Sequence, residues 1–380
     1  MTFRCFVFAG EPSGDALGAA ALQGMREHSA FTRTQFCGVG GQGLEKFFPS
    51  LVPIDAFATM DWGDIVKKLG YFWKVHRHLS RTIAYQKPDL LLTFDCPELS
   101  LPLARRVKAL SPSTCIVHVV APSVWAWRSY RAKPMARYLD GLLTLLPFEP
   151  AYFQPHGLHT QFVGHPATTL RNTKKDPTFF RRYPRVDSRR PILCCLPGSR
   201  QSEVERMGPI FAETLQQFCK LFPRYQILVP HFPEYASWVE SQGWIFIDSR
   251  ERHQVFARSR LALATSGTVT LELAMASVPM ITAYRMSRWA EFLAPRWIKT
   301  PFVSLPNICL DQDVVPEYLL QNCQPRSLCD ALLFLHINSS AQKSAWKHLG
   351  SLFPQEPAWG ERVAESIFTI LQRKRQTQSG

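Results

Sequence analysis

Two turns in the second half of the chain carry residues of the kinds that bind phosphate. One is Ser266-Gly267-Thr268, which separates an apolar strand-like run from a helix-like segment, and the other is Gly198-Ser199-Arg200, which also follows an apolar run. Backbone N–H groups at the start of a helix attract an anion, and the helix dipole adds positive potential. An arginine can donate two parallel hydrogen bonds to phosphate oxygens. Together the two turns predict a clamp for a diphosphate.

A carboxylate follows the first of these turns. Glu272 stands four residues after Thr268 and six after Ser266, whereas a capping box requires the acid three residues after the cap. Ordinary helix capping therefore does not explain this acid. We expect Glu272 to accept hydrogen bonds from the hydroxyls of a ribose.

A second acidic position lies in the first half of the chain, in the segment TFDCPELS. Asp95 ends an apolar strand-like run, and Glu98 follows closely. A carboxylate at a strand end can act as a general base when a substrate hydroxyl docks beside it. It can equally cap the helix that follows. From position alone both interpretations remain open.

Tryptophan and arginine lie together after another apolar run, in VVAPSVWAWRSYR. Trp125, Trp127, Arg128 and Arg131 belong to this segment. Aromatic and guanidinium groups together suit a sugar face, a base or a lipid phosphate, whereas the two tryptophans alone would suit a buried core.

An amphipathic helix is predicted over residues 61–81, with lysine and arginine covering much of its polar surface. A basic helix with tryptophans suits a membrane interface, although a core-packed helix with a solvated basic face is the commoner case. The net charge of the chain favours the membrane interpretation. Its expected membrane-contacting side chains are Trp62, Ile65, Val66, Leu69, Phe72 and Trp73.

Alternating apolar strands and helices must position these residues. Residues 4–10 and 191–196 each predict a strand that leads through a turn into a helix, and further strand-like runs occur between and after them. Continuous apolar strands that alternate with helices indicate parallel sheets covered on both faces. We therefore expect an α/β protein of two Rossmann-like domains whose parallel sheets face a central cleft.

The domain boundary is expected where charge and proline replace hydrophobic periodicity. We assign residues 1–168 to an N-terminal domain, 169–190 to a linker and 191–350 to a C-terminal domain. Residues 351–380 would form a C-terminal helix with a basic tail that crosses back to the N-terminal domain.

Composition limits the classes of partner. The 380 residues include 44 Lys and Arg against 30 Asp and Glu, a net charge of +14, which favours nucleic acid, anionic lipid or a phosphorylated substrate. The ten cysteines form no C-x-x-C pair and mostly lie in apolar runs, so we expect buried thiols in a reducing cytosol. No apolar run is long enough to span a bilayer. Glu11 and Asp15 directly follow the short apolar run at the N-terminus, which argues against a signal peptide.

Other motifs are absent or misleading. No H-E-x-x-H pattern or dense carboxylate cluster occurs, so no metal site is predicted, and the P-loop and G-x-S-x-G patterns are missing too. GVGGQG at 38–43 matches a dinucleotide fingerprint, but Pro49 follows too soon for its long helix. A glycine-rich turn near the cleft is the preferred interpretation.

Taken together, eight segments resemble the lipid-A-disaccharide synthase family and follow that family's order over nearly the whole chain. The segments are AGEPSGDALGA, FDCPELS, APSVWAWR, LPFE, FVGHP, LPGSRQSEVE, SGTVTLELA and SLPN. Pro12 stands where alanine is usual, and valine follows SGT where alanine is usual. Neither change removes a hydrogen-bond donor or a charge.

The resemblance implies an inverting glycosyltransferase of the GT-B fold that needs no metal or organic cofactor. Its donor would be UDP-2,3-diacylglucosamine and its acceptor 2,3-diacylglucosamine 1-phosphate (lipid X), joined at the cytoplasmic face of the inner membrane of a Gram-negative cell. The anionic surface of that membrane would be a partner, and the oligomeric state, homo-oligomer included, stays open.

The resemblance also implies roles for residues of both domains. Asp95 would be the catalytic base for the acceptor's 6-hydroxyl. The UDP-sugar would contact Ser199, Arg200, Ser266, Gly267, Thr268, Glu272 and Asn307. The acceptor side of the cleft would be lined by Glu11, Ser13, Gly14, Asp15, Ser123, Trp125, Trp127 and Arg128.

Two alternatives compete with this interpretation. One is another UDP-sugar enzyme of the same fold, either a UDP-N-acetylglucosamine 2-epimerase or a transferase with a lipid-linked acceptor. An epimerase would not need the basic helix. An RNA-binding protein would match the charge, but the base-stacking signatures of common RNA modules are missing and nucleic acid is not the expected partner.

Overall fold

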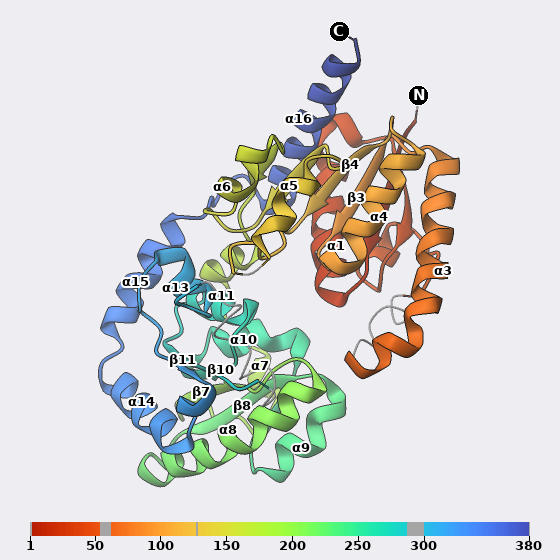
Figure 1. The fold of residues 1–380 in the computed structure, drawn as a ribbon. Helices are drawn as coiled ribbons and strands as arrows, with labels where there is room; N and C mark the ends of the chain where they lie inside the picture. Colours follow the sequence, from red (N-terminus) through yellow and green to blue (C-terminus); the bar gives the residue numbers. More distant parts are fainter. Residues whose placement is uncertain (1, 54–61, 127, 287–299, 380) are drawn as a thin grey trace. The chain divides into compact units, whose positions relative to one another are not determined.

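The computed structural model describes the chain except for residues 1, 54–61, 127, 287–299 and 380, and it gives only the backbone of 62–72 and 378–379 (Figure 1). Two compact units emerge, which are described separately. The first comprises Met1–Pro166 and Pro354–Gly380, and the second Ala167–Phe353. Residues 169–190, expected as a linker, belong to the second unit, where α7 (Phe179–Arg182) buries Phe179 completely.

The first unit is built on a parallel sheet of six described strands in the order β2-β1-β3-β4-β5-β6. The strands are β1 (Phe3–Ala9), β2 (Thr34–Val39), β3 (Leu90–Phe94), β4 (Cys115–Val119), β5 (Gly141–Thr144) and β6 (Thr160–Phe162). The strands β2 and β3, which follow β1 in the chain, pair with opposite sides of β1. The order of strands therefore reverses between β1 and β3, and in open α/β sheets ligands bind at such a point.

Both faces of this sheet are covered because successive strand residues point to opposite sides. Val7 packs on one face with α1 (Pro12–Glu27) and α16 (Trp359–Ser379). Phe6 packs on the other face. The helices contributing to that second layer are α3 (Trp62–Gln86), α4 (Pro97–Leu110), α5 (Ala132–Met135) and α6 (Pro150–Phe153).

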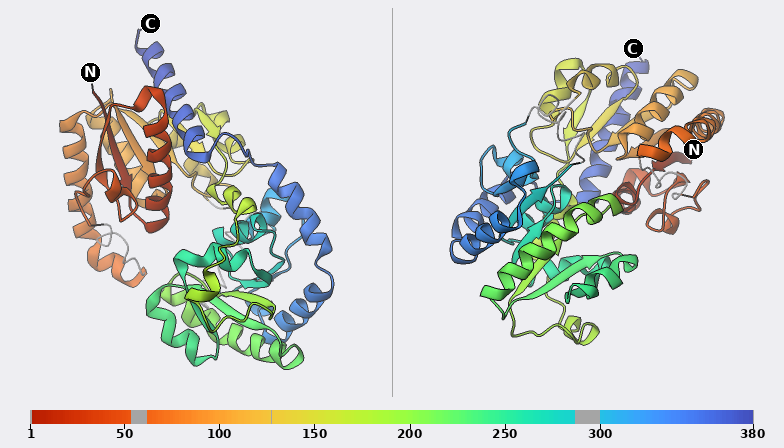
Figure 2. Two further views of the ribbon diagram at one scale, coloured as in Figure 1. Left: turned by 180° about the vertical axis from the view of Figure 1, so that it is seen from behind. Right: turned by 60° about the horizontal axis from the view of Figure 1, so that its bottom comes forward.

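The last helix of the chain belongs to the first unit. α16 lies beside α1 (Figure 2) and the two backbones meet at glycines: a Cβ added to Gly24 would fall 2.1 Å from the carbonyl carbon of Gly360. Trp359 donates its indole N–H to Gly164 O at 2.9 Å, and Lys374 pairs with Asp140 at 3.0 Å. The basic end of the chain is helical up to Ser379.

The second unit contains another parallel sheet of six described strands, in the order β12-β11-β10-β7-β8-β9. The strands are β7 (Ile192–Leu196), β8 (Gln226–His231), β9 (Ile245–Asp248), β10 (Ser259–Ala264), β11 (Met280–Tyr284) and β12 (Glu317–Leu319). Here the strand order reverses between β7 and β10. The prediction of an α/β protein with two parallel-sheet Rossmann-like domains is confirmed.

Helices cover this sheet as well. α8 (Gln201–Leu221), α9 (Ala236–Ser241) and α14 (Pro325–Ile337) contribute apolar side chains to one buried layer with β7, β8 and β10. The remaining described helices of the unit are α10 (Arg252–Phe256), α11 (Thr268–Met275), α13 (Leu305–Leu310) and α15 (Ser340–Ser351).

Candidate active site

The strand-order reversal in the first unit brings together two turns that are distant in sequence. Ala9 of β1 pairs with Phe94 of β3, so the turns that follow these residues leave the sheet side by side. A Cβ on Gly14 would lie 2.8 Å from the Phe94 carbonyl oxygen, which shows how closely α1 approaches the end of β3. The Ser13 hydroxyl donates to Oδ2 of Asp95 at 2.7 Å.

Asp95 is held in an unusual backbone conformation. Its φ is 50° and that of Cys96 is 45°, two successive non-glycine residues in the left-handed region. The Asp95 N–H donates to Val119 O at 2.9 Å, and its carbonyl accepts from the Ser100 hydroxyl at 2.7 Å. These bonds fix the backbone that carries a partly exposed carboxylate at the carboxyl end of β3, a position from which a carboxylate can act on a docked hydroxyl.

Glu11 and Cys96 lie beside Asp95. The Cys96 thiol donates to Oε1 of Glu11 at 3.5 Å. Burial, reinforced by the Glu11 charge, raises the pKa of the Cys96 thiol well above its ordinary value. The thiol is therefore protonated at neutral pH and supplies no nucleophile.

Asp15 binds the glycine-rich turn that follows β2. The residue is 8% exposed, and its carboxylate accepts backbone N–H groups from Gly41 at 2.7 Å, Gly43 at 2.8 Å and Leu44 at 3.1 Å. Asp15 thus holds the GVGGQG turn against α1. The turn leads into a short 3-10 helix over Leu44–Lys46 and not into a long helix.

The aromatic segment after β4 is anchored from two sides. The Trp125 indole N–H lies 3.4 Å from Oε1 of Glu149, and its ring meets Phe148 edge-on at 5.5 Å. Arg128 lies 3.8 Å from Glu98. Ser123 is exposed at the start of the segment. Trp127 lies outside the described residues.

Arg131 forms a two-pronged pair with Glu98, with both N–H···O distances at 2.8 Å. The hydrogen bond from Arg131 lowers the pKa of Glu98. The carboxylate of Glu98 therefore balances positive charge of the arginines in this segment. The sequence pattern did not indicate this pairing.

Glu149 is a buried titratable group that sequence reasoning missed as a site residue. It is 4% exposed, and Oε2 accepts the backbone N–H groups of Leu145 at 3.1 Å and Leu146 at 3.0 Å. Burial raises its pKa to about 7 despite these hydrogen bonds. The only signal in the sequence was its place in the segment LPFE.

The strand-order reversal in the second unit brings the two predicted phosphate turns together. Ala264 of β10 pairs with Leu196 of β7, and the Thr265 N–H donates to Leu196 O at 2.9 Å. Gly198-Ser199-Arg200 and Ser266-Gly267-Thr268 therefore leave the same edge of the sheet from neighbouring strands. Ser199, Arg200, Gly267 and Thr268 are exposed there.

In the Gly198-Ser199-Arg200 turn, the backbone N–H groups already donate to a carboxylate of the protein. Oε2 of Glu203 accepts the N–H groups of Ser199 at 2.9 Å and Arg200 at 3.3 Å. Burial, followed by the charge of Glu203, raises the pKa of the neighbouring Tyr284 hydroxyl. Glu203 is the N3 residue of α8, and its capping role was not recognised from the sequence.

The second turn is fixed by its hydroxyls. Ser266 donates to Val303 O at 2.8 Å, and Thr270 donates to Gly267 O at 2.8 Å. Apart from its two chain neighbours, no described residue places a heavy atom within 4 Å of the position that a Cβ on Gly267 would take.

Glu272 is a paired carboxylate on α11. Arg252 donates to it through Nε at 2.9 Å and through a terminal nitrogen at 3.4 Å, and His253 lies 3.8 Å away. Its side chain is 15% exposed. A carboxylate offers about four acceptor positions, so two donors do not exhaust it.

Asn307, predicted to contact the UDP-sugar, has a buried side chain that is bonded to the protein itself. It is fully buried, and its amide nitrogen donates to Val315 O and Glu317 Oε1, both at 2.9 Å. Its amide oxygen accepts from the N–H groups of Val314 at 2.9 Å and Val315 at 2.8 Å. The side chain of Asn307 thus joins α13 to the segment before β12, and both N–H groups of its amide are engaged inside the protein.

The predicted membrane helix is α3. Trp73 is 56% exposed, with the guanidinium groups of Arg77 and Arg106 at 5.2 and 5.8 Å from its ring centre. The side chains of Trp62, Ile65, Val66, Leu69 and Phe72 lie outside the described residues. Among the helices that the structure describes, none combines the length and apolarity needed to cross a bilayer. Within the described residues, no three His, Cys, Asp or Glu side chains are grouped as a bound metal would require.

Solved structures with the same architecture define the class of the protein. A putative UDP-N-acetylglucosamine 2-epimerase from Listeria monocytogenes aligns over 99% of this chain and 97% of its own, with a TM-score of 0.62 and 13% identity. An α,α-trehalose 6-phosphate synthase from Burkholderia multivorans aligns over 100% and 98%, with a TM-score of 0.59 and 11% identity. These likenesses establish the GT-B fold.

Sequence relationships identify the family. A family model described as lipid-A-disaccharide synthetase matches residues 5–356. The lipid-A-disaccharide synthase of Rhodospirillum centenum is 34% identical over 97% of this chain and 95% of its own length, and that of Ruegeria pomeroyi is 36% identical over 90% and 89%. The chain belongs to the lipid-A-disaccharide synthase family, the UDP-sugar-dependent glycosyltransferases of lipid A biosynthesis.

Proposed function

We propose that the chain transfers a 2,3-diacylglucosaminyl group from UDP to the 6-hydroxyl of 2,3-diacylglucosamine 1-phosphate. The products are a β-1,6-linked disaccharide 1-phosphate and UDP. The observation that carries this proposal is the coincidence of the motifs with the two strand-order reversals: Asp95 and Ser13 at one, Arg200 and Thr268 at the other. The epimerase alternative shares the fold, but the family match favours the synthase.

The donor would bind to the second unit. The exposed turn Gly267-Thr268 and the guanidinium of Arg200 would receive the diphosphate, supported by the start of α11. Glu272 would accept the ribose hydroxyls while Arg252 fixes the direction of its carboxylate. Glu203 would keep the Ser199 turn in shape, because its carboxylate already satisfies the donors of that turn.

The acceptor would bind to the first unit. Ser13 donates to one carboxylate oxygen of Asp95, which leaves the other to take the proton of the 6-hydroxyl. The hydroxyl oxygen then forms a bond to the anomeric carbon as the bond from that carbon to the diphosphate breaks. Attack opposite the leaving group inverts the anomeric centre, and UDP departs with the bonding electrons.

Membrane association would bring the acylated substrates within reach. The exposed Trp73, flanked by two guanidinium groups, supports contact of α3 with the anionic cytoplasmic surface of the inner membrane. The protein would act there as a peripheral enzyme.

The direct test incubates the purified chain with the two acylated glucosamine substrates and follows UDP and disaccharide 1-phosphate by mass spectrometry. We expect both products in equal amounts, and neither when lipid X is omitted. Interconversion of UDP-N-acetylglucosamine at C2 without an acceptor, and no disaccharide with one, would instead establish an epimerase.

A further inference from the structure

The amino ends of the strands in the second sheet carry a basic hollow of about 820 Å³. Arg190 precedes β7, Arg224 precedes β8 and Arg260 lies at the start of β10, so the hollow is at the opposite sheet edge from the phosphate turns. No acidic side chain is among the described residues that line it. Its cationic lining residues are Lys175, Arg189, Arg190, Arg224, Arg258 and Arg260.

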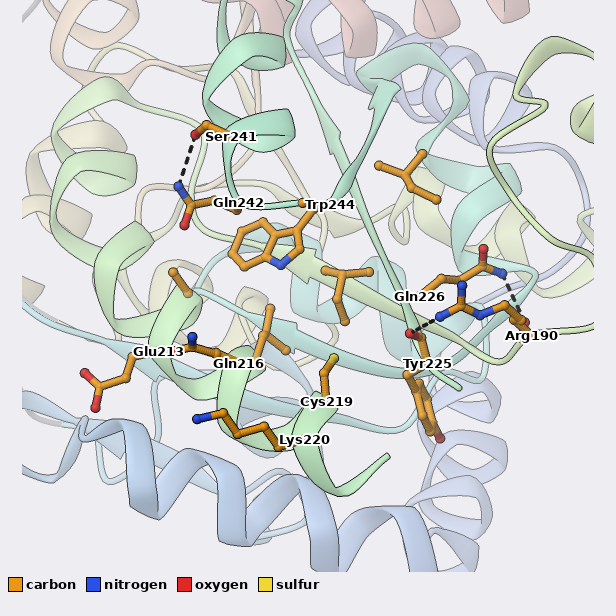
Figure 3. Close-up of a pocket in the computed structure, with 15 residues that line it drawn as sticks. Arg190, Glu213, Gln216, Cys219, Lys220, Tyr225, Gln226, Ser241, Gln242 and Trp244 are labelled. Carbon is orange, nitrogen blue, oxygen red and sulfur yellow. Dashed lines mark hydrogen bonds between the residues drawn. The ribbon is translucent and has the colours of Figure 1, made fainter. Parts of the chain in front are cut away.

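Two of these arginines are part of the structural frame. Arg190 donates to the carbonyls of Pro223, Arg224 and Tyr225 at 2.9–3.2 Å, and the bond to Tyr225 is visible in Figure 3, which shows the adjoining pocket. Arg258 lies over the Phe179 ring at 4.6 Å.

The other four cations, Lys175, Arg189, Arg224 and Arg260, are exposed, and we call them the basic rim. Among the described residues, a single acid–base contact involves the rim: Arg189 lies 3.6 Å from Asp187, and the arginine side chain is 89% exposed. A pair so exposed contributes little, and the positive charge of the rim remains available to solvent.

Apolar side chains are exposed near the ends of two helices, α8 and α14, that contribute residues to the lining of the hollow. Leu221 ends α8 and is 60% exposed, while Phe334 and Ile337 on the last turn of α14 are 64% and 75% exposed. The two helix ends are held together, since the Phe222 and His336 rings are 4.4 Å apart and His336 accepts or donates at 2.9 Å to the Tyr225 hydroxyl. Leu221 and His336 both line the basic hollow.

We propose that the basic rim and these three apolar side chains form a second membrane-docking surface, which binds an anionic phospholipid bilayer. Cations attract the negative surface potential, and apolar side chains insert at the boundary between headgroups and acyl chains. Single-stranded nucleic acid would instead require aromatic platforms for base stacking, and two of the three exposed side chains are aliphatic. The surface belongs to the second unit and is independent of the contact proposed for α3.

The test measures sedimentation of the full chain with vesicles of phosphatidylcholine containing phosphatidylglycerol. One variant combines Lys175→Gln, Arg189→Gln and Arg224→Gln. Each basic side chain near an anionic surface contributes about a fivefold gain in partitioning, so we expect a loss of at least about tenfold after screening. The matched control, Arg326→Gln with Lys343→Gln and Lys347→Gln, removes equal charge from exposed positions elsewhere in the unit.

Both variants are compared in the wild-type and Trp73→Ser backgrounds, so that loss of the α3 contact is measured separately. A second variant, Phe334→Ser with Ile337→Ser, should weaken binding to anionic vesicles about tenfold without changing turnover of detergent-dispersed substrates. Equal binding by the rim variant and its charge-matched control, with both folded by circular dichroism, would overturn the proposal. So would a rim variant that loses affinity for single-stranded RNA and keeps its affinity for vesicles.

Discussion

The protonation of Glu149 offers a test of the buried environment around this residue, because it makes the free energy of unfolding depend on pH. The carboxyl group is buried and lies 3.4 Å from the indole nitrogen of Trp125. Burial raises its pKa from 4.5 to about 7. Between these two values the folded protein keeps a proton that the unfolded chain releases. The free energy of unfolding of the wild type should therefore fall as the pH rises from about 4.5 to about 7.

The size of the effect follows from the shift. One pKa unit corresponds to about 1.4 kcal/mol, so a rise of roughly 2.5 units corresponds to about 3 kcal/mol in order of magnitude. Glu149→Gln removes the titrating group. Its altered contact with the Trp125 indole has an energy that does not depend on pH and cancels when two pH values are compared.

The assay is urea unfolding of both proteins at pH 5 and pH 8, followed by circular dichroism. We expect the midpoint of the variant, relative to the wild type, to rise by about 1–2 M urea between the two pH values. Glu98→Gln is the matched control, because the Arg131 hydrogen bond lowers the pKa of Glu98 and leaves it ionised throughout this range. A Glu149→Gln difference as flat as that of Glu98→Gln would refute the reasoning.

Three further predictions follow from the site. Asn307→Ala should destabilise the second unit by about 3 kcal/mol, measured by urea unfolding, because four buried hydrogen bonds are lost. Trp73→Ser should reduce sedimentation with anionic vesicles about tenfold, because an exposed aromatic ring is removed from a basic surface. Arg200→Ala should weaken UDP binding at least tenfold in isothermal titration calorimetry, because a charge-assisted pair with the diphosphate is lost.

Each of these has its own control. Asn338→Ala changes an exposed asparagine and should leave stability nearly unaltered, whereas a UDP affinity lost at wild-type stability would return Asn307 to the binding site. Tyr85→Ser removes another exposed ring from α3, and equal loss in both variants would show that Trp73 has no special contact. Arg326→Ala should leave UDP affinity unchanged, and an equally unchanged Arg200→Ala would exclude Arg200 from the clamp.

Much of the fold was predictable because buried parallel strands are continuous apolar runs. The runs ending at Phe94, Leu196 and Ala264 each became a strand at its expected place. Met280–Tyr284 was not predicted as a strand, although it has the same length as Ile192–Leu196, which was. The packing of α16 on α1 depends on Gly24 and Gly360. These two residues are far apart in the sequence, so no local pattern indicates their contact.

The candidate site was only partly predictable, for a related reason. Strand ends identified Asp95, Arg200 and Thr268, but not what their neighbours do. Asp15 and Asn307 are polar residues in characteristic motifs, and sequence alone cannot distinguish a carboxylate or amide that faces a ligand from one that satisfies buried backbone groups. That distinction required the hydrogen bonds of the folded chain.

The most direct measurement of the central claim is single-turnover formation of disaccharide 1-phosphate by Asp95→Asn, alongside its UDP affinity. If Asp95 takes the proton of the acceptor hydroxyl, the rate should fall about a thousandfold while the dissociation constant of UDP changes less than about threefold. Ser13→Ala, which removes only the hydroxyl that orients Asp95, should cause a smaller loss. Near-normal turnover by Asp95→Asn would contradict the account.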